Sequence, residues 1–298
     1  MMRSSAVLGL ALGRQTSHAV AIQPSSATQQ VVSLHTLATD HDDHLVESIK
    51  TLKADMLEPL PWYQRWMTSV VIGVDDDTVI SKTLTAADVD DPLEQEAMVG
   101  QALSQALNMD ISDLLFDFSK KDVGTQPGDA HYQVTACRQS TLAPILAACH
   151  QAKLNVSVVD RQQHGLQALY EALVAYHQPD AWPLWLHVCA GALTVTGKRT
   201  DGEDYQQRLS LTSPRQADAD DLSYQVLCQH IEHAYHAYLT QPGSHSDASV
   251  WLSGDWPEAM RFPAQIACHF INPGAPFGCE NLNAPATVAL GLALRGAQ

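Results

Sequence analysis

Strand-like and helix-like segments alternate along most of this sequence, and each half of it contains a strand–turn–strand hairpin. The first hairpin covers residues 7–22, and a third strand is expected at 31–37. The second hairpin covers residues 184–198 and is followed by an expected strand at 205–211. Alternation of strands with helices predicts an α/β protein whose helices cover both faces of its sheets.

Helices are predicted where apolar residues recur at three- and four-residue spacing. Residues 44–57 carry Leu45 and Ile49 in this pattern. Residues 92–107 begin with proline and acidic residues, which favour the first turn of a helix. The continuous apolar run SVVIGV at 69–74 is typical of a buried strand. Further helices are expected at 142–152, 166–176, 221–239 and 284–294, and further strands at 78–84, 114–118, 131–137, 154–160 and 250–253.

Composition limits the partners and the compartment. The 298 residues suffice for about two domains, and 17 Lys and Arg against 33 Asp and Glu give a formal charge of −16. Nucleic acids and anionic lipids favour clustered basic residues, so we expect neither as a direct partner. No apolar run approaches the roughly 20 residues of a membrane helix, and the start lacks the features of a signal peptide. We therefore expect a cytoplasmic protein, with its six scattered cysteines reduced.

Four stretches together resemble PilM-type actin-like proteins of type IV pilus assembly, which are related to actin-like proteins of MSHA-type pilus biogenesis. The resemblance implies an actin-like ATPase fold with two lobes, helices flanking mixed sheets, and an inserted small βαββα subdomain. Residues 1–77 with 154–180 would form the first lobe, 78–153 the insertion and 181–298 the second lobe. The four stretches are LGLALGRQTSHAVAI at 8–22, the acidic segment at 70–118, the helix and returning strand at 136–169, and APATVALGLALRG at 284–296.

In that family the two hairpins cradle the nucleotide phosphates, and each contributes a carboxylate that orients magnesium through water. Here Ala11 stands at the first carboxylate position and His187 at the second. His18 replaces the usual lysine, and Cys189 replaces a glycine of the second turn. The resemblance therefore implies a degenerate nucleotide site without catalytic residues or metal ligands.

The adenosine side of the site is altered as well, because Asp255 and Trp256 replace small residues after Gly254. Phosphoryl transfer depends on positioning and on metal-assisted charge stabilisation, so we predict no ATP hydrolysis. No cofactor is expected, apart from weak ATP binding through backbone amides. The remnant nucleotide site is predicted to comprise Gly9, Gly13, Gln15, Thr16, Gly191, Thr194 and Gly254.

The resemblance further implies a scaffold that binds the cytoplasmic N-terminal tail of an inner-membrane PilN-like protein. The tail would lie in a groove between the first lobe and the insertion, bordered by the 78–84 strand and the 92–107 helix. The chain would then lie at the inner membrane only through this partner. Two alternatives stay open: an active ATPase or kinase-like enzyme that recruits Asp160 or Asp255, and a cytoplasmic component of type II secretion.

Three other residue clusters have competing interpretations. The run DHDDH at 40–44 has metal-ligand chemistry, yet it precedes a predicted helix, where such residues serve as N-caps. The aromatic residues Trp62, Tyr63 and Trp66 are interpreted as a cap on the core, with a partner-contacting patch as the alternative. The histidines and Glu232 of the 221–239 helix are interpreted as a solvated polar face.

Overall fold

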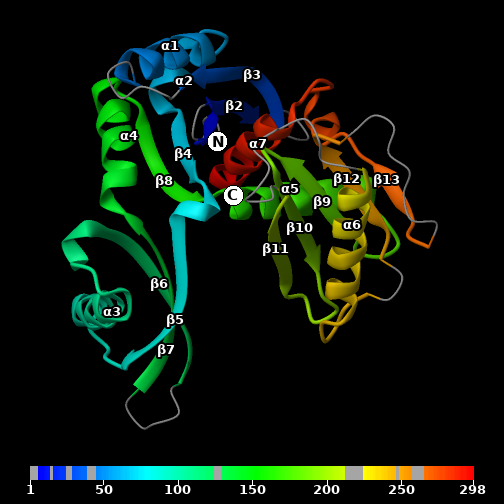
Figure 1. The fold of residues 1–298 in the computed structure, drawn as a ribbon. Coiled ribbons are helices and arrows are strands. Elements are labelled where there is room, and N and C mark those ends of the chain that lie inside the picture. The colour runs from blue at the N-terminus through cyan, green and yellow to red at the C-terminus, as the bar shows by residue number, and fades with distance from the viewer. Residues whose placement is uncertain are drawn as a thin grey trace.

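In the computed structural model the described strands form three sheets, two of which share one topology (Figure 1). The structure describes residues 6–13, 16–24, 29–38, 45–123, 129–211, 224–245, 248–256 and 265–298. The sheet of the first lobe has the strand order β3-β2-β1-β4-β8, and the sheet of the second has the order β11-β10-β9-β12-β13. In each lobe a three-stranded antiparallel meander is extended by a parallel strand beside its first strand.

The bounds of these strands match the predicted runs closely. The two hairpins and the strands at 69–74 and 154–160 are confirmed, whereas β13 had no signal in the sequence because it is only three residues long. The first sheet consists of β1 (Val7–Ala11), β2 (Thr16–Pro24), β3 (Gln29–Ala38), β4 (Ser69–Val74) and β8 (Asn155–Arg161). The second consists of β9 (Leu184–Cys189), β10 (Ala192–Lys198), β11 (Asp204–Ser210), β12 (Val250–Gly254) and β13 (Cys268–Phe270).

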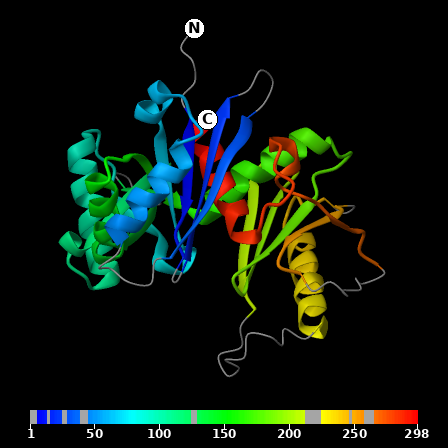
Figure 2. The same ribbon diagram turned by 90° about the horizontal axis from the view of Figure 1, so that it is seen from above.

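Helices α5 (Gln162–His177) and α7 (Ala284–Ala297) lie between the two sheets, and Figure 2 shows α7 in red between them. They cross closely, because a side-chain carbon on Gly291 would overlap the carbonyl oxygen of Gly165. The core around these helices is continuous, since it includes Val71 of the first sheet and Trp185 of the second. Both lobes are therefore joined through one buried core at the floor of the space between them.

The outer faces of the two sheets are covered by other helices. Helix α1 (Leu45–Leu57) buries its apolar stripe against the first sheet, together with part of α4 (Gln139–Gln151). Helix α6 (Tyr224–Leu239) packs on the second sheet through Leu227 and Ile231. No helix among the described segments is long and apolar enough to cross a membrane.

The third sheet is formed by the inserted segment, in the order β5-β7-β6. Its strands are β5 (Val79–Ala87), β6 (Leu114–Val123) and β7 (Asp129–Arg138), and α3 (Pro92–Leu107) covers one face. The predicted start of α3 is confirmed: the Asp91 carboxylate accepts the Leu93 N–H, and Pro92 occupies the first turn. Helix α4 is the last of the five elements expected in the insertion. It packs against α1 of the first lobe.

The interpretation of the aromatic cluster as a cap on the core is wrong. Trp62 and Trp66 lie on α2 (Trp62–Met67) and are 75% and 84% exposed. The Arg65 guanidinium holds this short helix by donating to the carbonyls of Leu60 and Glu58, at 2.8 and 2.7 Å. Helix α2 follows Pro61 and buries none of its residues, so the tryptophans face solvent. The run at 40–44 lies outside the described residues.

Candidate functional site: a central cleft and a lateral groove

A cleft of about 880 Å³ lies between the two lobes, where the turns of both hairpins meet. Four of the predicted site residues line it together: Gly13 and Thr16 from the first hairpin, and Gly191 and Thr194 from the second. The sequence repeat therefore places two equivalent turns at one site, as the resemblance implies.

Three other predicted site residues are not among those that line the cleft. Gly9 lies on β1 and faces α7, where any side chain would overlap the carbonyl oxygen of Ala289. Gly254 has a positive φ of 98° and packs against the backbone of Val188. These two glycines allow close packing of backbone. Gln15 lies outside the described residues.

One described amide in each hairpin turn already has a hydrogen-bond partner within the chain. In the first turn the Gly13 N–H donates to the Ser17 hydroxyl, at 3.3 Å. In the second, positive φ angles at Ala190 and Gly191 define the tight type I′ turn of a two-residue hairpin. The Ala190 N–H donates to the Asp255 carboxylate, whose pKa is raised by burial and partly restored by this bond. Turn amides of this kind would otherwise be free to bind anions.

His187, at the second expected carboxylate position, is buried and fully hydrogen-bonded. Its Nε2 lies 3.1 Å from the carbonyl oxygen of Ala284, which can only accept, so Nε2 carries the proton. Its Nδ1 accepts from the Ser253 hydroxyl at 2.9 Å, and that oxygen accepts the indole N–H of Trp185 at 2.9 Å. Burial lowers the pKa of His187 to about 4, so the ring is neutral at pH 7.

His18, at the expected lysine position, is also buried. Its Nδ1 lies 3.1 Å from the hydroxyl of Thr36 on the neighbouring strand, and burial lowers its pKa. Because Ala11 offers no polar group, the inner wall of the cleft carries a methyl group and two neutral imidazoles at the expected carboxylate and lysine positions. This wall lacks the fixed charges that hold a magnesium-bound triphosphate.

The charged groups of the cleft gather where the segment after β4 meets β11, and we call this side of the cleft its mouth. Asp75, Asp76 and Asp77 follow β4 and face the guanidinium groups of Arg161 and Arg208. This cluster was not predicted from the sequence. The sequence does carry a signal for it, namely three aspartates directly after the buried strand at 69–74. Polar residues at the carboxyl ends of parallel strands often line ligand-binding sites. Among the described residues, no group of three His, Cys, Asp or Glu is placed to hold a metal ion.

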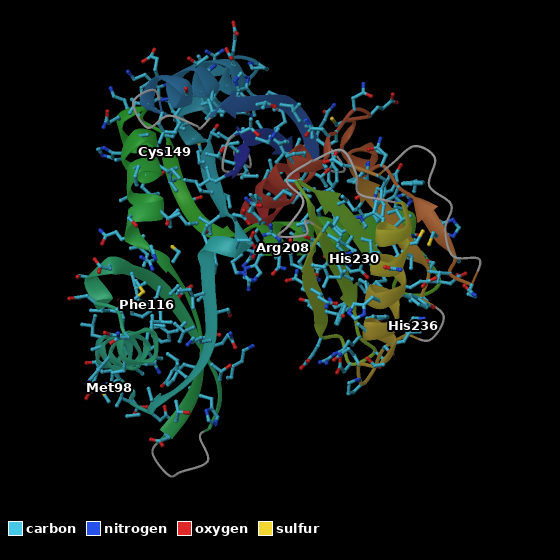
Figure 3. The ribbon with its side chains drawn as sticks, in the orientation of Figure 1. Met98, Phe116, Cys149, Arg208, His230 and His236 are labelled. Carbon is cyan, nitrogen blue, oxygen red and sulfur yellow. The ribbon has the colours of Figure 1, made fainter. Side chains whose placement is uncertain are left out.

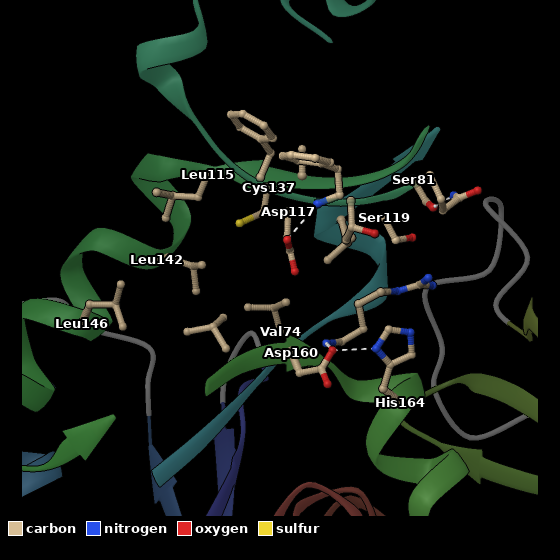
Figure 4. A pocket seen from close by; sticks show the side chains of 18 of the residues that line it. Val74, Ser81, Leu115, Asp117, Ser119, Cys137, Leu142, Leu146, Asp160 and His164 are labelled. Carbon is tan, nitrogen blue, oxygen red and sulfur yellow. Dashed lines mark hydrogen bonds and ion pairs between the residues drawn. The ribbon is translucent and has the colours of Figure 1, made fainter. Parts of the chain in front are cut away.

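A second cavity, the lateral groove, lies between the first lobe and the open face of the third sheet and encloses about 610 Å³. In Figure 4, Leu115, Leu142 and Leu146 gather at one side, while Ser81, Ser119 and His164 lie at the other. The expected border by β5 is confirmed. The expected border by α3 is wrong, because α3 packs on the opposite face of the third sheet and none of its residues lines the groove.

Asp160, one of the two carboxylates considered for an active enzyme, lies in the groove and not in the cleft. It binds His164 Nδ1 at 2.6 Å and Arg295 Nε at 3.4 Å. Burial opposes ionisation of Asp160, yet the hydrogen bond and charge of His164 together lower its pKa. Asp160 is therefore an ionised, partnered carboxylate at the polar end of the groove.

Comparison with known proteins gives structural likenesses only: no family model matches this chain, and no curated protein matches its sequence. A chain of the PilM–PilN type IV pilus biogenesis complex superposes with a TM-score of 0.65 at 19% identity, over 98% of both chains. The cytoplasmic domain of EpsL, an inner-membrane component of the type II secretion system of Vibrio cholerae, superposes with a TM-score of 0.51 at 13% identity, over 98% of this chain and 95% of that one.

These likenesses, with the duplicated sheet topology, confirm the expected α/β actin-like fold with two lobes and an inserted subdomain. The resemblance to PilM-type proteins is borne out at the level of the fold.

Proposed function

We propose that this chain is an actin-fold scaffold of type IV, or MSHA-like, pilus assembly that binds the cytoplasmic tail of an inner-membrane PilN-like protein. The lateral groove is the observation that carries the proposal. Its volume of about 610 Å³ suits a few side chains of an extended segment, and it combines an apolar wall with a polar end. The likeness to a chain of the PilM–PilN complex, which covers 98% of both chains, supports this choice of partner. Binding would hold the chain at the inner membrane from the cytoplasmic side.

Two adjacent valines of β8 give a matched test of the groove. Val159 lines the groove and Val158 does not, yet they are 38% and 40% exposed. Calorimetric titration with a synthetic PilN-like tail peptide should show at least tenfold weaker binding for Val159→Lys, because the lysine would place a charge on the apolar wall. Val158→Lys should bind like the wild type. Equal effects of the two variants, or no binding by the wild type, would contradict the proposal.

We also propose that the protein does not hydrolyse ATP. The support is the cleft itself. Ala11 and His187 stand at both expected carboxylate positions, and the N–H groups of Gly13 and Ala190 already donate hydrogen bonds to side chains of the protein. Titration with Mg–ATP should show weak or no binding, and phosphate release should stay at background. Magnesium-dependent turnover that is lost in an Asp255→Asn variant would instead support the enzyme alternative.

The likeness to the EpsL cytoplasmic domain keeps a role in type II secretion as the second candidate. The two candidates differ in the partner. A parallel titration with peptides from cytoplasmic segments of type II secretion proteins distinguishes them, since the proposed pilus scaffold should bind only the PilN-like tail. Tighter binding of a type II segment would indicate that the groove binds a type II secretion protein.

A further inference from the structure

Strand β11 of the second lobe faces the first lobe with a row of alternate side chains. Asp204 accepts from the Gln167 amide at 2.8 Å, and the Gln206 amide donates to the Gln163 carbonyl at 3.0 Å. Next along this face, Arg208 lies 2.5 Å from Asp75 and 3.5 Å from Asp77. Because strand side chains alternate between faces, the three residues reach the first lobe together. Figure 3 shows Arg208 between the two lobes.

The aspartates that meet Arg208 are held rigidly by the first lobe. Asp76, with only 7% of its side chain exposed, accepts from Arg161 at 2.8 Å and from the Gln163 N–H at 3.2 Å. Asp75 also accepts the Asp77 N–H at 3.3 Å. Arg208 and Asp75 are each 23% exposed, so their ion pair is partly shielded from water and is stronger than a surface pair.

The charges at this contact are close to balance only while both guanidinium groups are present. Three carboxylates, Asp75, Asp76 and Asp77, face Arg161 and Arg208. Loss of Arg208 would leave the three carboxylates and Arg161, all of the first lobe, without any charge from the second lobe to attract them, and closure of the cleft at this point would lose its electrostatic stabilisation. The floor of the cleft would still hold, because the buried core of α5 and α7 joins the lobes there.

We propose that Asp75, Asp76 and Asp77 with Arg208 form an ion-pair clasp that holds the mouth of the central cleft closed. The clasp performs within the chain the bridging of two lobes that a bound ligand would otherwise perform. It makes closure of the cleft depend on the balance of these charges and on ionic strength. The inference concerns the cleft alone and is independent of which partner the groove binds.

Hydrogen–deuterium exchange of the whole chain tests the clasp. In Arg208→Gln, the amides of β11 and of the segment after β4 should exchange about tenfold faster than in the wild type, whereas α5 and α7 should keep their protection. The matched control is Arg199→Gln, which removes the same charge from the same lobe. Arg199 pairs with Asp201 and Glu203 of its own lobe, so this variant should exchange like the wild type.

A charge-reversed pair separates the clasp from a general loss of stability. Asp75→Arg alone and Arg208→Asp alone should both open the mouth, and the double variant should restore at least part of the protection. Urea unfolding of each variant verifies that the molecules compared are folded. The proposal would be overturned if the amides of Arg208→Gln exchanged at the wild-type rate. It would also be overturned if the exchange in the double variant were accelerated by the sum of the two single effects. If any single variant unfolds, the exchange rates of the wild type at about 0.05 M and about 1 M salt test the proposal instead. Screening by salt should accelerate exchange at the mouth alone.

Discussion

Acidification should destabilise this protein through His187, because the folded cleft wall holds the ring neutral. The pKa of His187 is about 4 in the fold, against 6.5 for an unperturbed histidine. A second proton on Nδ1 would meet the proton of the Ser253 hydroxyl, which donates to this nitrogen while its oxygen accepts the Trp185 N–H. Between these two pKa values the unfolded chain binds the proton and the folded chain does not, so the free energy of unfolding falls as the pH falls.

The size of the effect follows from the two pKa values. The stabilising contribution is complete above pH 6.5 and is lost progressively towards pH 4. At pH 5 the unfolded state gains about 2 kcal/mol from protonation of this one residue, and below pH 4 about 3 kcal/mol. For a protein of marginal stability this is a large fraction of the total.

Urea unfolding at pH 8 and pH 5, followed by tryptophan fluorescence, measures this contribution. The wild type should lose about 2 kcal/mol more than His187→Gln between the two values, because all other titrating groups are shared. His150→Gln on α4 is the control, since that side chain lies in solvent. Equal losses in wild type and His187→Gln would refute the reasoning. If His187→Gln does not fold, nuclear magnetic resonance of the wild-type ring decides, because a titration above pH 5 would contradict a buried neutral imidazole.

Two further predictions concern packing. Gly291→Ala should lower the free energy of unfolding by about 1–3 kcal/mol, measured by urea unfolding, because its methyl group must displace the backbone of Gly165; an unchanged midpoint would contradict the close crossing of α5 and α7. Trp66→Ala should change stability by no more than about 0.5 kcal/mol, whereas Trp185→Ala should cost about 3–5 kcal/mol, since the first indole is 84% exposed and the second is fully buried. Similar losses for the two tryptophans would show that α2 packs on the core.

Periodicity located most elements because it reports which residues of one strand or helix share a face. The apolar spacing of 44–57 placed α1, and the two strand-like runs of the first hairpin placed β1 and β2, each within a few residues. The same logic failed for Trp62 and Trp66, since a short helix that follows two prolines has no repeat from which its buried side can be read.

The candidate sites were predictable to different depths. The resemblance to PilM-type proteins implied that Ala11 and His187 stand where carboxylates are expected, because the hairpins can be matched to that family by sequence. The hydrogen bonds that Ser17 and Asp255 accept from turn N–H groups were not predictable, since these contacts depend on how the turns are placed. The groove was expected between the right elements, yet its border by α3 was wrong, because sequence does not tell which face of a three-stranded sheet its helix covers.

The sequence by itself determined the order of strands and helices, the repeated hairpins and the loss of charge from the inner wall of the cleft. Only the tertiary structure decided which distant residues meet. Asp75 and Arg208 are far apart in the chain and come together because β11 and the end of β4 face each other across the cleft. Local pattern fixes the faces of each element, but long-range contacts depend on how α5 and α7 pack the two sheets together.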